Sequence, residues 1–355
     1  MRRDLIVDKM RGAVRNSRGL LFYTRNVEQF SSLLLRGANF IPFNPSDSKE
    51  TPMTTPRKPA DMSRRTFGLG AIGTTASAAV LTGAMTGAGQ GATAAEAAVT
   101  PTPNKGRLNQ SLCKWCYDRN LSLDDLCVIA KELGMVGIDL LTPKDFETVK
   151  KHGLVCTMVS SHPLSEGLCD PKYWDKSLAI LNETIEATSA AGFRNVITFS
   201  GNARGIDRKT GMKNCVEALK KIVPVAEKKN VILNMELLNS RVDHGDYMCD
   251  LSAWGVELCK EVGSDHFKLL FDIYHMQIME GDIIRTIQKN HKYFGHYHTG
   301  GNPGRHEIDD SQELYYPAVA KAIADTGYDG YFSHEFIPVQ DVKVGLAEAV
   351  KRCTV

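Results

Sequence analysis

An alternation of short apolar runs with amphipathic segments dominates the chain after about residue 107. Eight runs are short and almost continuously apolar, as parallel strands buried on both faces are. They are residues 108–113, 137–141, 155–160, 195–200, 231–237, 268–273, 293–298 and 330–336. Segments with apolar residues at helical spacing lie between most of them, at 122–134, 173–191, 212–229, 253–262, 282–289, 314–326 and 342–352. The pattern predicts an α/β fold of the (β/α)8 TIM barrel type. An open doubly wound sheet is disfavoured, because no run leads into a glycine-rich nucleotide loop.

The first 97 residues differ from the rest in charge, with 13 Lys and Arg against 7 Asp and Glu. The sequence SRRTFG at 63–68 carries paired arginines, and a weakly apolar run rich in Ala, Gly and Thr follows at 69–88. Small-residue cleavage candidates come next, at 92–94 and 95–97. This order predicts a twin-arginine signal, a partner in the twin-arginine export machinery, and a bacterial protein exported to the periplasm or beyond. So many Gly and Thr residues disfavour a stable membrane span.

These signals predict the domain organisation. Because export signals begin close to the start of a chain, we expect residues 1–52 to be an unstructured upstream extension, with translation starting at Met53 or Met62. Residues 53–97 are then the signal peptide, 98–106 a linker rich in Pro and Thr, and 107–355 the barrel domain.

Charge and cysteine content exclude some classes of function. The chain after residue 97 is mildly acidic, which gives no electrostatic reason to expect nucleic acid as a partner. Nine cysteines at irregular spacing do not form the pattern of a disulfide framework. Cys113 and Cys116 form a single CxxC, whereas structural zinc sites normally use a second pair, so we interpret both as core residues. A monomer and a homo-oligomer are both compatible with this composition.

Four residues able to bind metal stand at the ends of the last four predicted strands. Glu236, Asp272, His298 and Glu335 each close an apolar run, and alternation along the strands points them into the barrel at one depth. Three crowded carboxylates would repel one another unless a cation neutralised them. Together with an imidazole they suit Mn²⁺ or Mg²⁺, with Co²⁺ or Zn²⁺ as alternatives. His296, one layer lower, is expected in the core or behind a ligand.

Several of these segments resemble a known family. FDIYHMQIMEGD (271–282), GNPGRHEI (301–308) and YDGYFSHEF (328–336) resemble hydroxypyruvate isomerases, within the xylose-isomerase-like TIM barrel family of sugar isomerases and epimerases. ELLNSRVD (236–243) is similar to the family's glutamate segment, and the resemblance covers roughly residues 107–355. It implies an intramolecular oxidoreductase of the aldose–ketose type acting on a small keto acid or sugar. The substrate it implies first is hydroxypyruvate, converted to 2-hydroxy-3-oxopropanoate (tartronate semialdehyde).

The resemblance also implies roles for individual residues. Glu236 and Glu335 would face opposite sides of the keto compound, one removing a proton beside the carbonyl and the other returning it across a cis-enediolate. A metal on the carbonyl oxygen would stabilise that enediolate. The expected substrate contacts are His275, Arg305, Arg241 and His162.

The sequence departs from this family pattern in two places. Hydroxypyruvate isomerases tend to carry Gln where this chain has His298, whereas ketose 3-epimerases carry His. A ketose 3-epimerase or another sugar isomerase is therefore the alternative enzyme. The export signal is the second departure. A non-catalytic carbohydrate-binding barrel is the alternative of another class, and the presence of both Glu236 and Glu335 argues against it.

Overall fold

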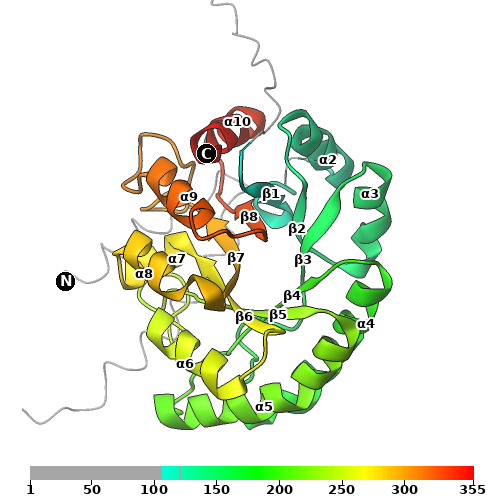
Figure 1. Ribbon diagram of the computed structural model, residues 1–355, viewed down its shortest axis with the longest axis vertical. Coiled ribbons are helices and arrows are strands. Elements are labelled where there is room, and N and C mark those ends of the chain that lie inside the picture. Colours follow the sequence, from blue (N-terminus) through cyan, green and yellow to red (C-terminus); the bar gives the residue numbers. More distant parts are fainter. Residues whose placement is uncertain (1–105, 120) are drawn as a thin grey trace, which may run out of the picture. The chain divides into compact units, whose positions relative to one another are not determined.

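The computed structural model describes residues 106–119 and 121–355, and in this part eight parallel strands close into a barrel (Figure 1). The strands pair in chain order, and β8 closes the ring by pairing with β1. The strands are β1 (Asn109–Cys113), β2 (Gly137–Leu141), β3 (Val155–Val159), β4 (Asn195–Thr198), β5 (Ile232–Glu236), β6 (Phe267–Asp272), β7 (Phe294–Thr299) and β8 (Tyr331–His334). The predicted (β/α)8 barrel is confirmed, with strand limits within a few residues of those expected.

Helices surround the barrel as an outer ring (Figure 1). They are α2 (Leu123–Glu132), α3 (Phe146–Lys151), α4 (Trp174–Ala190), α5 (Arg208–Lys229), α6 (Ser252–Val262), α7 (Ile273–Met279), α8 (Ile283–Asn290), α9 (Tyr316–Ala324) and α10 (Val342–Cys353). Two of them, α3 and α7, were not predicted, because each is at most seven residues long and gives little helical periodicity. Helix α7 starts directly after β6, where the Asp272 side chain accepts a hydrogen bond from the backbone N–H of His275.

The interior of the barrel below the strand ends is polar. Asp139, Thr157 and His296 have no solvent exposure, and Asp139 accepts hydrogen bonds from both of the others. Buried polar groups need such partners, because an unpaired one costs the free energy of its lost hydration. The apolar core lies mainly where the strands meet the helices.

The nine cysteines are buried and free. Burial raises the pKa of the Cys113 thiol and of the Cys116 thiol well above the ordinary value. Neither residue of the CxxC is then a thiolate at neutral pH, so their interpretation as core residues agrees with the structure.

Residues 1–52, the signal peptide expected at 53–97 and most of the expected linker lie outside the described residues. These assignments remain predictions. Within residues 106–119 and 121–355, no helix is long and apolar enough to cross a membrane.

Candidate active site

The four predicted ligands meet at the carboxyl-terminal end of the barrel. Glu236 ends β5, Asp272 ends β6, His298 lies in β7, and Glu335 directly follows β8. Each offers one ligand atom, and these atoms lie within 4.8 Å of one another in buried positions. We call these four residues the strand-end cluster. The register explains the meeting, since Asp272 pairs with His298 across β6 and β7.

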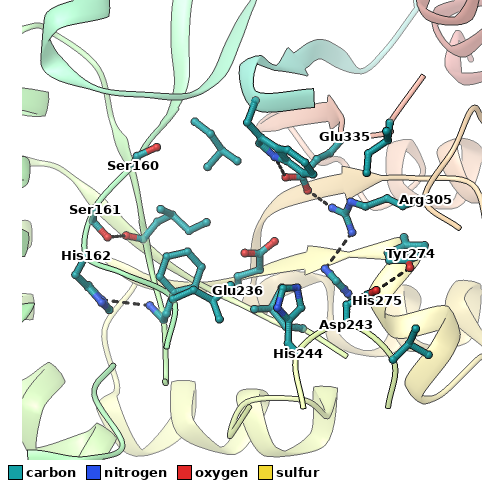
Figure 2. A pocket seen from close by; sticks show the side chains of 18 of the residues that line it. Ser160, Ser161, His162, Glu236, Asp243, His244, Tyr274, His275, Arg305 and Glu335 are labelled. Atoms are coloured by element: carbon teal, nitrogen blue, oxygen red, sulfur yellow. Dashed lines mark hydrogen bonds and ion pairs between the residues drawn. The ribbon is translucent and has the colours of Figure 1, made fainter. Parts of the chain in front are cut away.

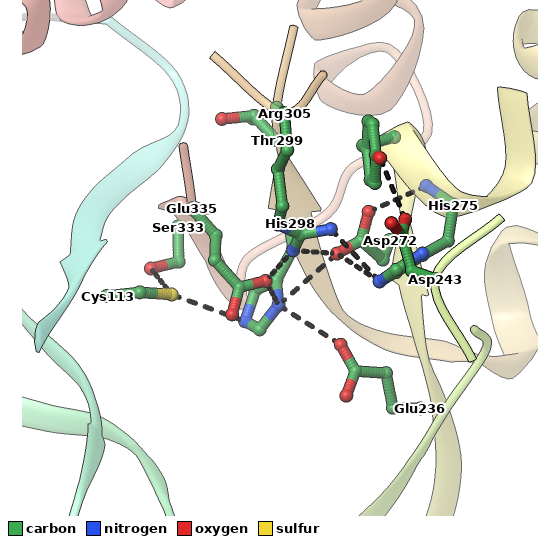
Figure 3. Close-up of polar contacts among 12 residues, drawn as sticks. Cys113, Glu236, Asp243, Asp272, His275, His298, Thr299, Arg305, Ser333 and Glu335 are labelled. Carbon is green, nitrogen blue, oxygen red and sulfur yellow. Dashed lines mark hydrogen bonds and ion pairs between the residues drawn. The ribbon is translucent and has the colours of Figure 1, made fainter. Parts of the chain in front are cut away.

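The two ring nitrogens of His298 have different surroundings (Figure 3). Nε2 lies 2.6 Å from Asp139 Oδ2 and makes a hydrogen bond with it. Nδ1 faces three carboxylates, at 2.6 Å from Glu335, 3.5 Å from Glu236 and 3.8 Å from Asp272. None of these approaches has the geometry of a hydrogen bond, so Nδ1 is a buried nitrogen without a hydrogen-bond partner. A buried imidazole nitrogen among three carboxylate oxygens is the donor set of a divalent cation site.

The two glutamates of the cluster differ in charge state. Burial raises the pKa of Glu236 to about 7, and the neighbouring Glu335 charge adds to this, although His298 acts against it. Burial also favours a neutral Glu335, but Arg305 and then His298 outweigh it and hold its pKa well below the ordinary range. One carboxylate is therefore ionised while the other takes up and releases a proton near neutral pH.

Arg305 and His275 form the second polar group of the site. Arg305 Nη2 lies 2.6 Å from Asp272 Oδ2 and also contacts Glu335. Its Nη1 lies 3.0 Å from His275 Nε2. On its other side, His275 Nδ1 lies 2.7 Å from the amide nitrogen of Asn239.

The amide of Asn239 determines which nitrogen of His275 carries the proton. Asn239 Oδ1 already accepts from the backbone N–H groups of Val242 and Asp243, so its NH₂ group must face His275. His275 Nδ1 is therefore the acceptor, and Nε2 carries the hydrogen. Burial lowers the pKa of His275 well below its ordinary value, so the ring is neutral. Two donors, His275 Nε2–H and Arg305 Nη1–H, thus converge without an acceptor between them.

A cavity of about 590 Å³ opens above the strand-end cluster (Figure 2). Its charged lining residues all come from the β5–β8 side, and they are Glu236, Asp243, Arg305 and Glu335. Its β2–β4 side is uncharged, with Leu140, Leu164, Ile197 and Phe199 beside Ser160, Ser161 and His162. A binding molecule therefore meets charged groups on one side and uncharged groups on the other.

The structure brings most predicted substrate contacts to this cavity, but not all of them. His275, Arg305 and His162 line it, whereas Arg241 does not. The Arg241 guanidinium instead donates to the backbone carbonyl of Ile278, at 2.8 Å, and so joins the loop after β5 to α7. The structure thus places Arg241 away from the cavity lining, and its contact with a substrate stays a prediction.

His162 lines the cavity with its ring, while its polar atoms are used elsewhere. Nε2 lies 2.9 Å from Thr198 Oγ1, and Nδ1 lies 3.1 Å from the carbonyl of Glu166. Burial lowers the pKa of His162 to about 4, so the ring is neutral at ordinary pH. His162 connects the ends of β3 and β4 and offers the cavity an uncharged surface.

Sequence reasoning missed three residues of the site. Asp139 contacts His298 from below, Asn239 orients His275, and Trp115 donates its indole N–H to Glu335 Oε1 at 2.5 Å. A charged residue inside the apolar run 137–141 was a usable signal for Asp139, because a buried carboxylate needs partners. Trp115 lies in a short 3-10 helix after β1 and Asn239 in the loop after β5, and neither had a comparable signal.

Comparison with known proteins agrees with this geometry. A family model described as xylose isomerase-like TIM barrel matches residues 130–352. The chain is 34% identical over 140 residues to the 2-oxo-tetronate isomerase of Cupriavidus necator, covering 39% of this chain and 53% of that protein. It is 27% identical over 172 residues to a putative hydroxypyruvate isomerase of Homo sapiens, covering 47% of this chain and 62% of that protein. The D-psicose 3-epimerase of Ruminiclostridium cellulolyticum is 32% identical over 129 residues, covering 35% and 41%. These matches span about half the length of the curated relatives.

Solved structures support the fold. A protein from Brucella melitensis described as an AP endonuclease of family 2 superposes with a TM-score of 0.62 at 24% identity, covering 69% of this chain and 98% of that one. The 3-keto-D-glucoside 4-epimerase YcjR of E. coli gives a TM-score of 0.58 at 18% identity, covering 69% and 97%. At these identities the likeness shows the barrel alone.

Proposed function

The chain belongs to the xylose isomerase-like TIM barrel family, and we propose that it is a metal-dependent isomerase or epimerase that moves a proton beside the carbonyl group of a small keto compound. The observation that carries this proposal is the pairing of Glu236 and Glu335 in one buried cluster with Asp272 and His298. Two carboxylates at one site can act as base and acid when a reaction takes a proton from one carbon and returns one.

The strand-end cluster fits a divalent cation, because its three carboxylates surround the unpartnered Nδ1 of His298. We expect Glu236, Asp272, His298 and Glu335 to hold it, with Mn²⁺ or Mg²⁺ favoured over Co²⁺ or Zn²⁺ by the excess of oxygen ligands. When bound, the cation supplies Lewis-acid stabilisation of negative charge on a substrate oxygen.

Glu335 and Glu236 divide the proton transfer. Ionised Glu335 accepts the proton from the carbon beside the carbonyl, and the electron pair of that C–H bond becomes part of an enediolate. Glu236 donates a proton to complete the reaction. Delivery to the former carbonyl carbon, with the hydroxyl proton of the first carbon passing to the former carbonyl oxygen, gives an isomer. Delivery to the first carbon from the other face gives an epimer.

His275 and Arg305 orient the substrate. Because His275 Nε2–H and Arg305 Nη1–H lie 3.0 Å apart with no acceptor between them, a substrate oxygen would relieve their repulsion. As that oxygen gains charge in the enediolate, both hydrogen bonds strengthen. The neutral His275 ring donates without protonating the intermediate.

Two substrates remain as finer proposals. Hydroxypyruvate follows from the sequence resemblance, and a ketose epimerised at the carbon beside its carbonyl is the second candidate. The cavity favours the second, since among the described residues Arg305 is the one Arg or Lys that lines it, and it already pairs with Asp272 and Glu335. The carboxylate of hydroxypyruvate would meet Glu236 and Asp243 as well, whereas an uncharged sugar would not.

Solvent exchange tests the proposed function. Purified protein loaded with Mn²⁺ is incubated in D₂O with a panel of ketoses and with hydroxypyruvate, and deuterium uptake beside the carbonyl is followed by NMR. We expect uptake with at least one compound, and a loss of about 10²–10⁴-fold in Glu335→Gln. Binding without exchange by the wild-type protein would identify a carbohydrate-binding barrel, and full exchange in Glu335→Gln would refute the role of that residue.

We also propose that the protein acts outside the cytoplasm, on the strength of the twin-arginine pattern at residues 63–68. Replacing both arginines, Arg64 and Arg65, by Lys should retain the full-length precursor inside bacterial cells. Unchanged export of that variant, measured by cell fractionation, would contradict the proposal.

A further inference from the structure

A fully buried carboxylate below the strand-end cluster is not used by the reaction described above. Asp139 lies in β2, while its partner His298 lies in β7, so the contact crosses the barrel interior. Asp139 has no solvent exposure, and neither has His298. Burying a charge is costly, and such a group persists where its partners compensate it.

Four side chains hydrogen-bond to this carboxylate. Thr157 Oγ1 donates to Oδ1 at 2.9 Å, and His298 Nε2 and His296 Nε2 approach Oδ2 at 2.6 and 3.0 Å. The Cys113 thiol is the weakest donor, at 3.5 Å from Oδ2. The three contacts to Oδ2 leave this oxygen no lone pair for a proton of its own. The hydrogen between Asp139 Oδ2 and His298 Nε2 therefore belongs to His298.

This assignment fixes the other nitrogen of His298. An imidazole that binds a cation is neutral and carries one N–H and one lone pair, so in that state a hydrogen on Nε2 leaves the lone pair on Nδ1. Nδ1 is the atom that faces Glu236, Asp272 and Glu335 without a hydrogen bond. Histidine ligands of metals are commonly oriented by such a carboxylate on their second nitrogen.

We propose that Asp139 is a positioning residue that holds His298 with its hydrogen on Nε2 and thereby presents Nδ1 as a metal ligand. The inference rests on the metal site of the proposed function, but not on the reaction or its substrate. His296 donates to the same oxygen and fixes the direction of the carboxylate from one layer lower. Nothing in the structure explains why the Nδ1 atom of His296 is buried without a partner.

A competing arrangement would place a cation between Asp139, His296 and His298, whose ligand atoms also lie within 4.8 Å of one another. That arrangement would require both Nε2 atoms to lose their hydrogens and would give up both hydrogen bonds to Asp139. If a cation also occupies the strand-end cluster, the competing arrangement predicts two ions per chain. A positioning role for Asp139 predicts one ion per chain.

The first test measures metal affinity in metal-stripped protein by titration calorimetry with Mn²⁺ and with Zn²⁺. We expect one ion per chain, and an affinity about 10–100-fold weaker in Asp139→Leu, which removes the acceptor. Asp139→Asn retains a carbonyl oxygen and should recover much of the loss. Thr157→Val is the matched control, because it removes a hydrogen bond from the same carboxylate without touching His298. It should keep the wild-type affinity within about threefold, well inside the range expected for a lost ligand-orienting contact.

The second test needs no variant at position 139. In Zn²⁺-loaded wild-type protein, long-range ¹H–¹⁵N spectra of the imidazoles should show His298 protonated on Nε2 and bound through Nδ1, with the signal assigned by its loss in His298→Gln. Zinc on Nε2, two ions per chain, no metal binding by the wild type, or unchanged affinity in a natively folded Asp139→Leu would each overturn the inference. Tight, Asp139-dependent metal binding without proton exchange on any keto compound would refute the reaction and leave this inference standing.

Discussion

The two halves of the barrel contribute opposite kinds of surface to the cavity. Strands β5–β8 and their loops supply Glu236, Asp243, Arg305 and Glu335, which are its charged lining residues. Strands β1–β4 and their loops supply an uncharged wall that includes Leu140, Ile197 and Phe199. The histidine on this wall, His162, is neutral because burial lowers its pKa to about 4. The two glutamates proposed to transfer the proton thus lie in one half, while the other half lines the cavity with uncharged groups.

This division indicates how the family's fold can serve several substrates. The groups proposed to hold a cation and move a proton come from consecutive strands, so their mutual geometry is fixed by strand register. The opposite wall can change in shape without disturbing that register. Variants in the two halves should therefore differ in kind, with losses in turnover on one side and losses in substrate affinity on the other.

The largest effect is expected on the charged side. Glu236→Gln keeps the shape of the side chain but cannot donate and accept a proton, so turnover should fall about 10²–10⁴-fold. Metal content is measured on the same sample, to separate loss of the cation from loss of proton transfer. Glu257→Gln is the control, since Glu257 lies on the surface of α6 and pairs with Lys260. Turnover within a few-fold of wild type in Glu236→Gln, with metal retained, would contradict the division of roles.

Low pH should destabilise the folded protein through His162, which lies on the uncharged wall of the cavity. The unfolded imidazole of His162 takes up a proton near pH 6.5, whereas in the folded chain its pKa is about 4. Its contribution is therefore complete above pH 6.5 and is lost as the pH falls, by up to roughly 3 kcal/mol at pH 4 at about 1.4 kcal/mol per pH unit. Urea unfolding at pH 7, 6, 5 and 4 measures this loss. His162→Gln should show a shallower dependence on pH, and equal slopes would mean that His162 is protonated in the folded protein.

Substitution of Arg305 should lower catalytic activity less than substitution of Glu236. Arg305→Lys keeps the charge but loses the planar fork that reaches Asp272, Glu335 and His275 together. Loss of a charged hydrogen bond worth about 1.5–3 kcal/mol corresponds to roughly 10–100-fold in kcat/KM. Arg352→Lys, on the surface of α10, is the matched control. Equal kinetics in the two variants would show that Arg305 acts only as a charge.

The site residues contributed by β5–β8 could be predicted from the sequence, whereas the cavity residues contributed by β1–β4 could not. Glu236, Asp272, His298 and Glu335 stand out because each is a polar group closing an apolar run, and the barrel rule converts that position into a shared depth. Ile197 and Phe199 look the same in sequence whether they line a cavity or pack in a core. Asn239 and Trp115 lie in segments that follow strands, and the path of such segments depends on contacts distant in the chain. The position of Arg241 could not be predicted for the same reason, since the path of its loop turns its side chain towards Ile278.

The smallest effect is expected from a substitution on the uncharged wall supplied by β1–β4. This substitution should change KM rather than turnover. Phe199→Ala removes an aromatic surface from the cavity, so KM should rise about tenfold, as expected for losing roughly 1.4 kcal/mol of apolar contact. Turnover should stay within about threefold, because no group that moves a proton is touched. Phe193→Ala is the control: Phe193 also belongs to an aromatic pair, with Phe146 at a centroid distance of 4.9 Å, but it does not line the cavity. If Phe199→Ala lowered turnover as strongly as Glu236→Gln, the two halves would not be separable, and the substrate would depend on both for its reactive geometry.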